Sequence, residues 1–109
     1  MEVTMNENTF NVSGEYSEAW FTGFDTWERN TFPVLDHFKD NKKGVYIDIG
    51  AWIGPTVLYC ANIYDRVIAI EPDPVAIERL EENLSVNKFN NVTLIKKGLS
   101  DITGKMKFG

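Results

Sequence analysis

The chain has 109 residues, which suffices for one domain with a modest hydrophobic core. Its formal net charge of -5 lacks the basic excess that phosphate contacts need, so we expect no nucleic acid as a partner. No apolar run approaches the ~20 residues of a membrane span, and the N-terminus lacks a signal-peptide pattern. We therefore expect a cytoplasmic protein with no membrane contact, and we expect the single cysteine, Cys60, to lie in the core.

Residues 1–43 are expected to form an N-terminal cap segment and a lead-in helix. Residues 9–12 read as a short strand, and Asp25 with Glu28 three positions later reads as a capping box. The helix would begin near Thr26, and Pro33 would kink or divide it. Three aromatic residues are expected to cover apolar surface beneath them: Trp20, Phe21 and Phe24.

Residues 44–109 alternate between strand and helix signals. Apolar runs over 45–49, 66–71 and 92–95 predict three strands, and the second is expected to be covered on both faces, as in parallel sheets. Pro55 opens a helix that runs to about residue 63. Asp73 followed by Pro74 predicts the N-terminus of a second helix, and 105–108 is expected to begin a fourth strand.

Right-handed crossovers between these strands give the spatial order third, second, first. The predicted fold class is α/β, a partial doubly wound (Rossmann-like) parallel sheet of order 3-2-1 with an N-terminal helical and aromatic cap. Residues 44–109 would be the first half of a cofactor-binding domain, which we expect to continue beyond this chain. The free edge of strand 45–49 would favour self-association.

Polar and glycine residues gather where the first two predicted strands end. Asp48 and Gly50 lie at the end of the first strand, and Glu71 lies at the end of the second, 21 positions after Gly50. Ligands of doubly wound sheets bind at the carboxyl ends of the strands, and an acid at about this spacing accepts hydrogen bonds from ribose hydroxyls. The sequence therefore predicts a ligand that contains a ribose.

The glycine loop narrows the choice of nucleotide. A Walker loop needs a lysine after its second glycine, but Pro55 follows Gly54. A dinucleotide fingerprint needs a glycine where Trp52 stands, and Trp would obstruct the pyrophosphate. Asp48 suits an ammonium group better than a phosphate. S-adenosylmethionine carries an ammonium, a carboxylate and a ribose, so we expect it as the cofactor.

Two stretches resemble the Rossmann-like S-adenosylmethionine-dependent methyltransferases, and most closely their FkbM family: Val45 to Pro55 and Val67 to Pro72. Weaker echoes of that family are the Leu-Ser-Asp of 99–101 followed by Gly104, and the lead-in of Trp27, Glu28 and Thr31. The resemblance implies a methyltransferase, with O-methylation of a small molecule or sugar. Two alternatives stay open: a fragment of a nicotinamide-dependent oxidoreductase, and a truncated fold unit without catalysis.

The resemblance also implies a role for individual residues. Asp48 would hold the methionine ammonium, Glu71 would accept from both ribose hydroxyls, and Pro72 would pack on the adenine. Further members of the expected cofactor site are Gly50, Ala51 and Gly54 in the glycine loop, Leu99 and Ser100 at the adenine edge, and Glu28 and Thr31 near the methionine end. Simpler roles compete with these, since Glu28 serves equally well as a capping-box partner and Ser100 as a turn former. No metal site is expected, and the sequence leaves the catalytic base unidentified.

Overall fold

Three parallel strands form the centre of the computed structural model, which describes residues 1–27, 30–38, 44–100 and 103–105. They are β3 (Val45–Ile49), β4 (Arg66–Ile70) and β5 (Val92–Ile95), in the order β3-β4-β5. In the register of the sheet, Ile49 is opposite Ile70, and Ile70 is opposite Ile95. The strand order and the parallel sheet confirm the predicted fold class.

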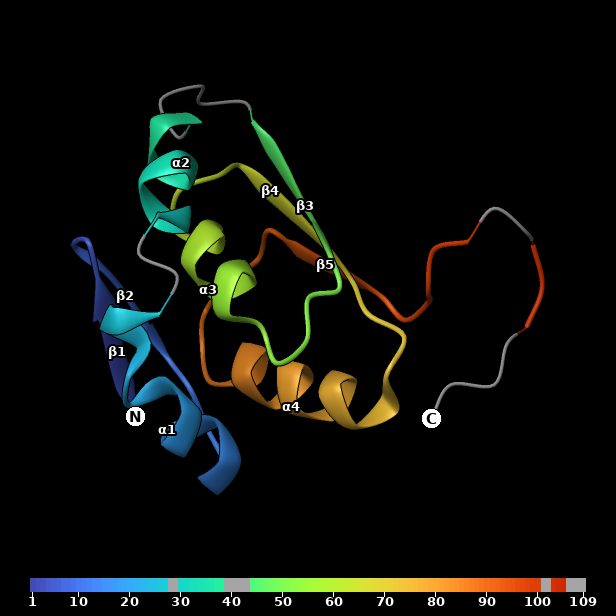
Figure 1. The fold of residues 1–109 in the computed structure, drawn as a ribbon, viewed down its shortest axis with the longest axis horizontal. Helices are drawn as coiled ribbons and strands as arrows, with labels where there is room; N and C mark the ends of the chain where they lie inside the picture. The colour runs from blue at the N-terminus through green and yellow to red at the C-terminus, as the bar shows by residue number, and fades with distance from the viewer. Residues whose placement is uncertain (28–29, 39–43, 101–102, 106–109) are drawn as a thin grey trace.

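Two helices connect the strands and lie on one side of the sheet (Figure 1). They are α3 (Pro55–Ala61) and α4 (Pro74–Ser85). Both crossovers step in the same direction across the sheet, and right-handed connections then bring both helices to the same face. The predicted start of α4 is confirmed, because the Asp73 side chain caps the helix and accepts a hydrogen bond from the Val75 amide at 3.1 Å.

Side chains on the two faces of the sheet are therefore solvated differently. On the helix side, Val67 and Ala69 of β4 have no exposed surface. On the other side, Val45, Ile47 and Ile49 of β3 are 52%, 55% and 64% exposed. The expectation that β4 is covered on both faces is wrong here, since its alternate residues are only partly buried. The apolar run reflects strand propensity as well as burial.

The first part of the chain adds a hairpin and three short helices. These elements are β1 (Glu2–Met5), β2 (Asn8–Asn11), α1 (Glu15–Phe21), the 3-10 helix η1 (Phe24–Thr26) and α2 (Thr31–Phe38). β1 and β2 pair antiparallel, and residues with positive φ, Asn6 and Glu7, make the turn between them. Among the described residues, no helix is long and apolar enough to cross a membrane.

Two expectations about this part of the chain need correction, and two of its elements were not expected. β1 and α1 were not predicted, and the helix expected from Thr26 begins at Thr31, because Trp27 has an extended backbone. Pro33 lies in the first turn of α2, where its missing amide costs no hydrogen bond, so it does not divide the helix. The fourth strand expected at 105–108 lies, beyond Lys105, outside the described residues.

One aromatic core joins the N-terminal elements to the sheet and its helices. The ring centroids of Phe10 in β2 and Phe24 in η1 are 5.7 Å apart, and those of Phe24 and Phe32 are 5.1 Å apart. Phe32 then meets Tyr59 of α3 at 4.7 Å. These four side chains are almost fully buried. This shared core does not test the predicted division of the chain at residue 43, which remains a prediction.

Candidate functional site

A cavity of about 600 Å³ opens at the carboxyl ends of the three strands. Its lining includes four residues singled out in the sequence: Gly50, Pro72, Leu99 and Ser100. Ile49 and Ile70 add apolar surface to the cavity. Cavities of this size hold small ligands and cofactors, and the carboxyl edge of a parallel sheet is where such ligands bind.

The two glycines of the loop have different surroundings. Gly50 has a φ of +78°, and a Cβ added there would meet nothing within 4 Å, so a ligand can approach its backbone closely. Gly54 has a φ of +103°, and a Cβ there would lie 2.6 Å from Cδ1 of Leu80. Gly54 therefore lets α3 and α4 approach each other. Ala51, between these glycines, is buried in the core.

Glu71 lies at the end of β4 and holds the backbone of two segments with its carboxylate. Its Oε1 accepts from the Trp52 amide at 2.7 Å, and its Oε2 accepts from the Asp73 amide at 2.9 Å. The residue is only 6% exposed. Each carboxylate oxygen has a second lone pair, so Glu71 keeps capacity for two more donors, such as a pair of ribose hydroxyls.

Asp48 is 8% exposed and lies on the helix side of the sheet. Its Oδ2 accepts a hydrogen bond from the Thr56 hydroxyl in the first turn of α3. Burial raises the pKa of Asp48, and the nearby Glu71 raises it further, while the bond from Thr56 lowers it. Burial, with a smaller effect of Asp48, raises the pKa of the neighbouring Tyr46 to about 12. A cationic ligand group beside Asp48 would stabilise its ionised carboxylate, which burial disfavours.

Trp52 has a φ of +55°, unusual for a residue with a side chain. Its ring packs edge-on against Trp20 of α1, with centroids 5.0 Å apart, and meets Tyr16 at 6.4 Å. The side chain is thus directed to the N-terminal elements. Its expected obstruction of a pyrophosphate remains a prediction.

The two residues expected near the methionine end are less informative. Glu28 lies outside the described residues. Thr31 begins α2 and is not among the described residues that line the cavity. Their assignment to the cofactor site stays a prediction. Within the described segments, no group of three or more His, Cys, Asp or Glu side chains is arranged to hold a metal ion.

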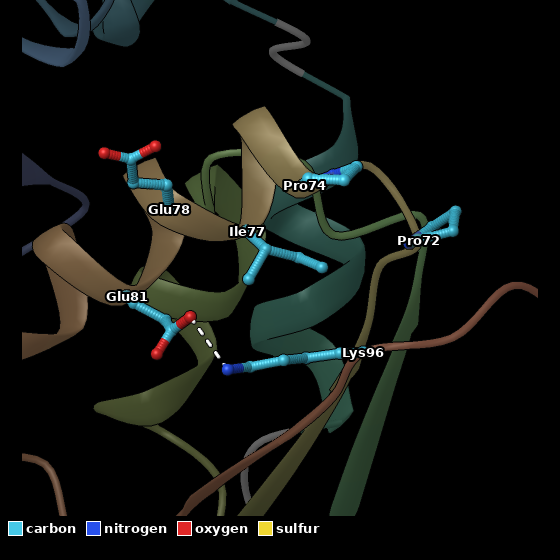
Figure 2. A pocket seen from close by; sticks show the side chains of 6 residues that line it. All are labelled: Pro72, Pro74, Ile77, Glu78, Glu81 and Lys96. Atoms are coloured by element: carbon cyan, nitrogen blue, oxygen red, sulfur yellow. Dashed lines mark ion pairs between the residues drawn. The ribbon is translucent and has the colours of Figure 1, made fainter. Parts of the chain in front are cut away.

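A second, shallower hollow of about 540 Å³ lies between α4 and the end of β5 (Figure 2). Pro72 and Lys96 line both hollows. Lys96 forms an ion pair with Glu81 at 3.0 Å, and Figure 2 shows the two side chains reaching toward each other. Both side chains are about half exposed, so the pair contributes little to stability.

Several residues at or near the site were not recognised from the sequence as parts of it. Lys96 and Lys97 directly follow β5 and both line the cavity. Thr56 was missed as the partner of Asp48. Asn83 was missed too, although its spacing from Ile77 and Leu80 puts it on the apolar side of α4, where a buried polar residue is an informative signal.

The parallel sheet with its carboxyl-edge cavity is the Rossmann-like arrangement of methyltransferases of known structure. No family model matches the chain. The crystal structure of Trm5b from Pyrococcus abyssi aligns with a TM-score of 0.51 and 27% identity, covering 84% of this chain and 26% of that one. The M. jannaschii TYW2 structure, in complex with AdoMet, aligns with a TM-score of 0.53 and 23% identity, covering 86% of this chain and 41% of that one. AdoMet, the ligand of that neighbour, is S-adenosylmethionine.

Sequence comparison finds similar relatives. The tRNA (guanine(37)-N(1))-methyltransferase Trm5b of Pyrococcus abyssi is 32% identical over 95 residues, which are 86% of this chain and 27% of the relative. A probable ribosomal RNA small subunit methyltransferase A of Methanosphaera stadtmanae is 32% identical over 63 residues, 58% of this chain and 23% of the relative. The chain thus spans about a quarter of the length of these relatives.

These relatives correct the expectation about partners. A small-molecule acceptor and the absence of nucleic acid were expected, but the relatives are named for methylation of tRNA and rRNA. The error came from the net charge, which averages over the whole chain and says nothing about local surfaces or about the rest of a longer protein. The finer resemblance to the FkbM family is not confirmed by these relatives, whereas the wider resemblance to S-adenosylmethionine-dependent methyltransferases is supported.

Proposed function

We propose that this chain forms the S-adenosylmethionine-binding part of a methyltransferase that acts on RNA. The observation that carries the proposal is the cavity at the carboxyl ends of β3, β4 and β5, lined by Gly50 and Pro72 and by the residues after β5. In this proposal Glu71 accepts from the ribose hydroxyls and Asp48 faces the methionine ammonium. Both carboxylates lie at the strand ends beside the cavity, and neither is among the described residues that line it. The RNA acceptor is taken from the names of the relatives.

The chemistry of methyl transfer explains what such a site must do. The methyl carbon moves from a sulfonium to a nucleophile in line, so positioning of the two partners supplies much of the catalysis. Gly50 leaves space beside the backbone, and Ile49 and Ile70 give one side of the cavity an apolar lining. S-adenosylmethionine, when bound, supplies the methyl group.

Isothermal titration calorimetry with S-adenosylmethionine tests cofactor binding, with NAD as the comparison ligand. Glu71→Ala is expected to weaken binding by ~1.5–3 kcal/mol, since hydrogen bonds to a charged group are lost. Glu78→Ala is the matched control, because Glu78 is an exposed acid on α4 and should leave affinity unchanged. Tighter binding of NAD than of S-adenosylmethionine would overturn the cofactor assignment.

The acceptor class needs a separate measurement. Fluorescence anisotropy of a labelled transfer RNA, titrated with protein saturated with S-adenosylhomocysteine, should show binding that weakens as salt rises. A DNA duplex of similar length is the control for simple polyanion binding. Equal affinity for both nucleic acids would contradict the RNA assignment and leave the cofactor result untouched.

A further inference from the structure

The side chain of Asn83 lies at the junction between α4, the N-terminal segment and the glycine loop. It has no exposed surface. Its Oδ1 accepts from the Ser13 amide at 2.9 Å, and its Nδ2 donates to the Ile53 carbonyl at 2.9 Å and to the Ser17 hydroxyl at 3.1 Å. The amide of Ser13 can only donate and the carbonyl of Ile53 can only accept, so these partners fix the orientation of the side-chain amide.

The bond to Ile53 matters because it ties the glycine loop to α4. In the part of the chain that the structure describes, the other hydrogen bonds of the loop run to the end of β4, within its own turn and into the start of α3. The amides of Gly50 and Ala51 both donate to the Ile70 carbonyl, at 2.8 and 3.1 Å. The Trp52 amide donates to Glu71, at 2.7 Å. Asn83 thus provides an anchor on α4, at the opposite end of the loop.

Trp52 lies between two of these anchors, in the left-handed conformation that disfavours residues with a side chain. Such strain persists only where the surroundings hold both sides of the residue. Glu71 holds the Trp52 amide, and Asn83 holds the next carbonyl along the chain, that of Ile53. Without the Asn83 bond, the peptide after Ile53 would be held on its amide side, where the Gly54 amide donates to the Ala51 carbonyl at 3.0 Å, but no longer by Asn83 on its carbonyl side. We expect this to loosen the loop that presents the Trp52 amide to Glu71.

We propose that Asn83 is a positioning residue for the cofactor site, which holds the glycine loop in the conformation that orients the Glu71 carboxylate. This inference rests on the proposed function, because its consequence for binding requires S-adenosylmethionine at Glu71. Asn83 does not touch the cofactor in this proposal. It acts through Ile53, Trp52 and Glu71, and it ties this geometry to the N-terminal segment through Ser13 and Ser17.

Asn87 provides a matched control one helical turn further along. Its side chain accepts from the Asn11 amide and donates to the Asn11 carbonyl, both at 2.8 Å, and it also donates to the Asn83 carbonyl at 2.7 Å. Asn87 therefore attaches the hairpin to the end of α4 by two bonds and makes a third to α4 itself, and none of the three involves the glycine loop. Asn87→Ala should lower stability without changing the cofactor site.

The test compares Asn83→Ala and Asn87→Ala with the parent chain at a temperature where urea curves show all three folded. Calorimetry should find S-adenosylmethionine bound about tenfold more weakly by Asn83→Ala, and unchanged by Asn87→Ala. Hydrogen exchange of the Trp52 amide in the free protein should be about tenfold faster in Asn83→Ala alone. If Asn83→Ala does not fold, Asn83→Ser replaces it in both measurements.

The two readouts separate the inference from the proposed function. A parent chain that binds no S-adenosylmethionine defeats the proposed function, and exchange at Trp52 then decides the role of Asn83 in the loop. The inference is overturned if the parent chain binds S-adenosylmethionine and the two variants show equal affinities and equal exchange of the Trp52 amide. Asn83 would then be a purely structural residue.

Discussion

The covered face of the sheet and its open face carry side chains from the same strands in different surroundings. On the covered face, Val67 and Ala69 are fully buried beneath the helices, and Asp48 is nearly so. On the open face, Val45 and Ile47 are more than half exposed. A given substitution should therefore have different energetic consequences on the two faces, and the following predictions test that difference from the largest expected effect to the smallest.

Leu80 of α4 is fully buried in the core beneath Gly54. Leu80→Ala should lower the free energy of unfolding by about 3 kcal/mol, through lost burial and the cavity that remains. Ile47→Ala on the open face removes a comparable amount of hydrocarbon and should cost less than about 1 kcal/mol, mainly through strand propensity. Urea denaturation measures both, and similar losses would contradict the difference between the faces.

Gly54→Ala should lower the free energy of unfolding by about 2 kcal/mol, since its Cβ would clash with Leu80 in an unfavourable backbone conformation. Gly50→Ala is the control with a similar backbone but open space around the new Cβ, and it should cost about 1 kcal/mol. In the double variant Gly54→Ala with Leu80→Ala, the clash disappears. The double variant should therefore lose less free energy of unfolding than the sum of the losses of the two single variants. Strict additivity would argue against this contact.

The buried Asp48 predicts a particular dependence of stability on pH. Burial raises its folded pKa above the ordinary 3.8, so the native state binds more protons than the unfolded state. The contribution of Asp48 to the free energy of unfolding must therefore fall as pH rises from 3.8 through the folded pKa, and it stays low above that pKa. Asp48→Asn keeps an acceptor for Thr56 but cannot ionise, so it removes this dependence.

Thermal unfolding of the parent and Asp48→Asn at pH 4 and pH 7 checks this prediction. The variant should gain stability relative to the parent as pH rises. Parallel pH profiles would mean that Asp48 titrates as an exposed acid does. Glu78→Gln, an exposed acid of α4, controls for the general effect of removing a negative charge.

The smallest effect is expected for Val45→Thr, which replaces a methyl by a hydroxyl on the open face. Val45 is 52% exposed, so the new hydroxyl stays hydrated and stability should change by less than about 0.5 kcal/mol. The same substitution at the fully buried Val67 should cost about 1–3 kcal/mol, because a hydroxyl is desolvated there. Equal effects at the two positions would show that the open face is covered in solution.

The β3-to-β5 segment could be predicted closely because its signals are local. Apolar runs delimit β3 and β5 at the residues expected, and Asp73 with Pro74 marks the start of α4. The N-terminal elements lack comparable local signals for where they begin and end. α1 is held by its aromatic contacts, such as Phe21 against Phe10 at 5.8 Å, and these depend on residues distant in sequence. Tertiary packing thus decided structure that propensity could not.

The candidate site could be predicted only in part, because only some of its features follow from local sequence signals and topology. Sheet topology brings together the ends of the strands, so Gly50, Pro72, Leu99 and Ser100 meet at one cavity as their positions suggested. The partners of buried polar groups depend on how helices pack on the sheet. Thr56 at Asp48 and Asn83 at Ile53 are contacts of this kind, and no local pattern specifies them.

The open face has a calorimetric consequence. The heat capacity change of unfolding comes mainly from apolar surface that is newly exposed to water, and the denaturant m-value scales with the same quantity. Val45, Ile47 and Ile49 already contact water for more than half of their surface, so unfolding exposes less there than in a sheet covered on both sides. The stability curve of this chain should accordingly be broad and shallow, with a weaker dependence on temperature than its length suggests.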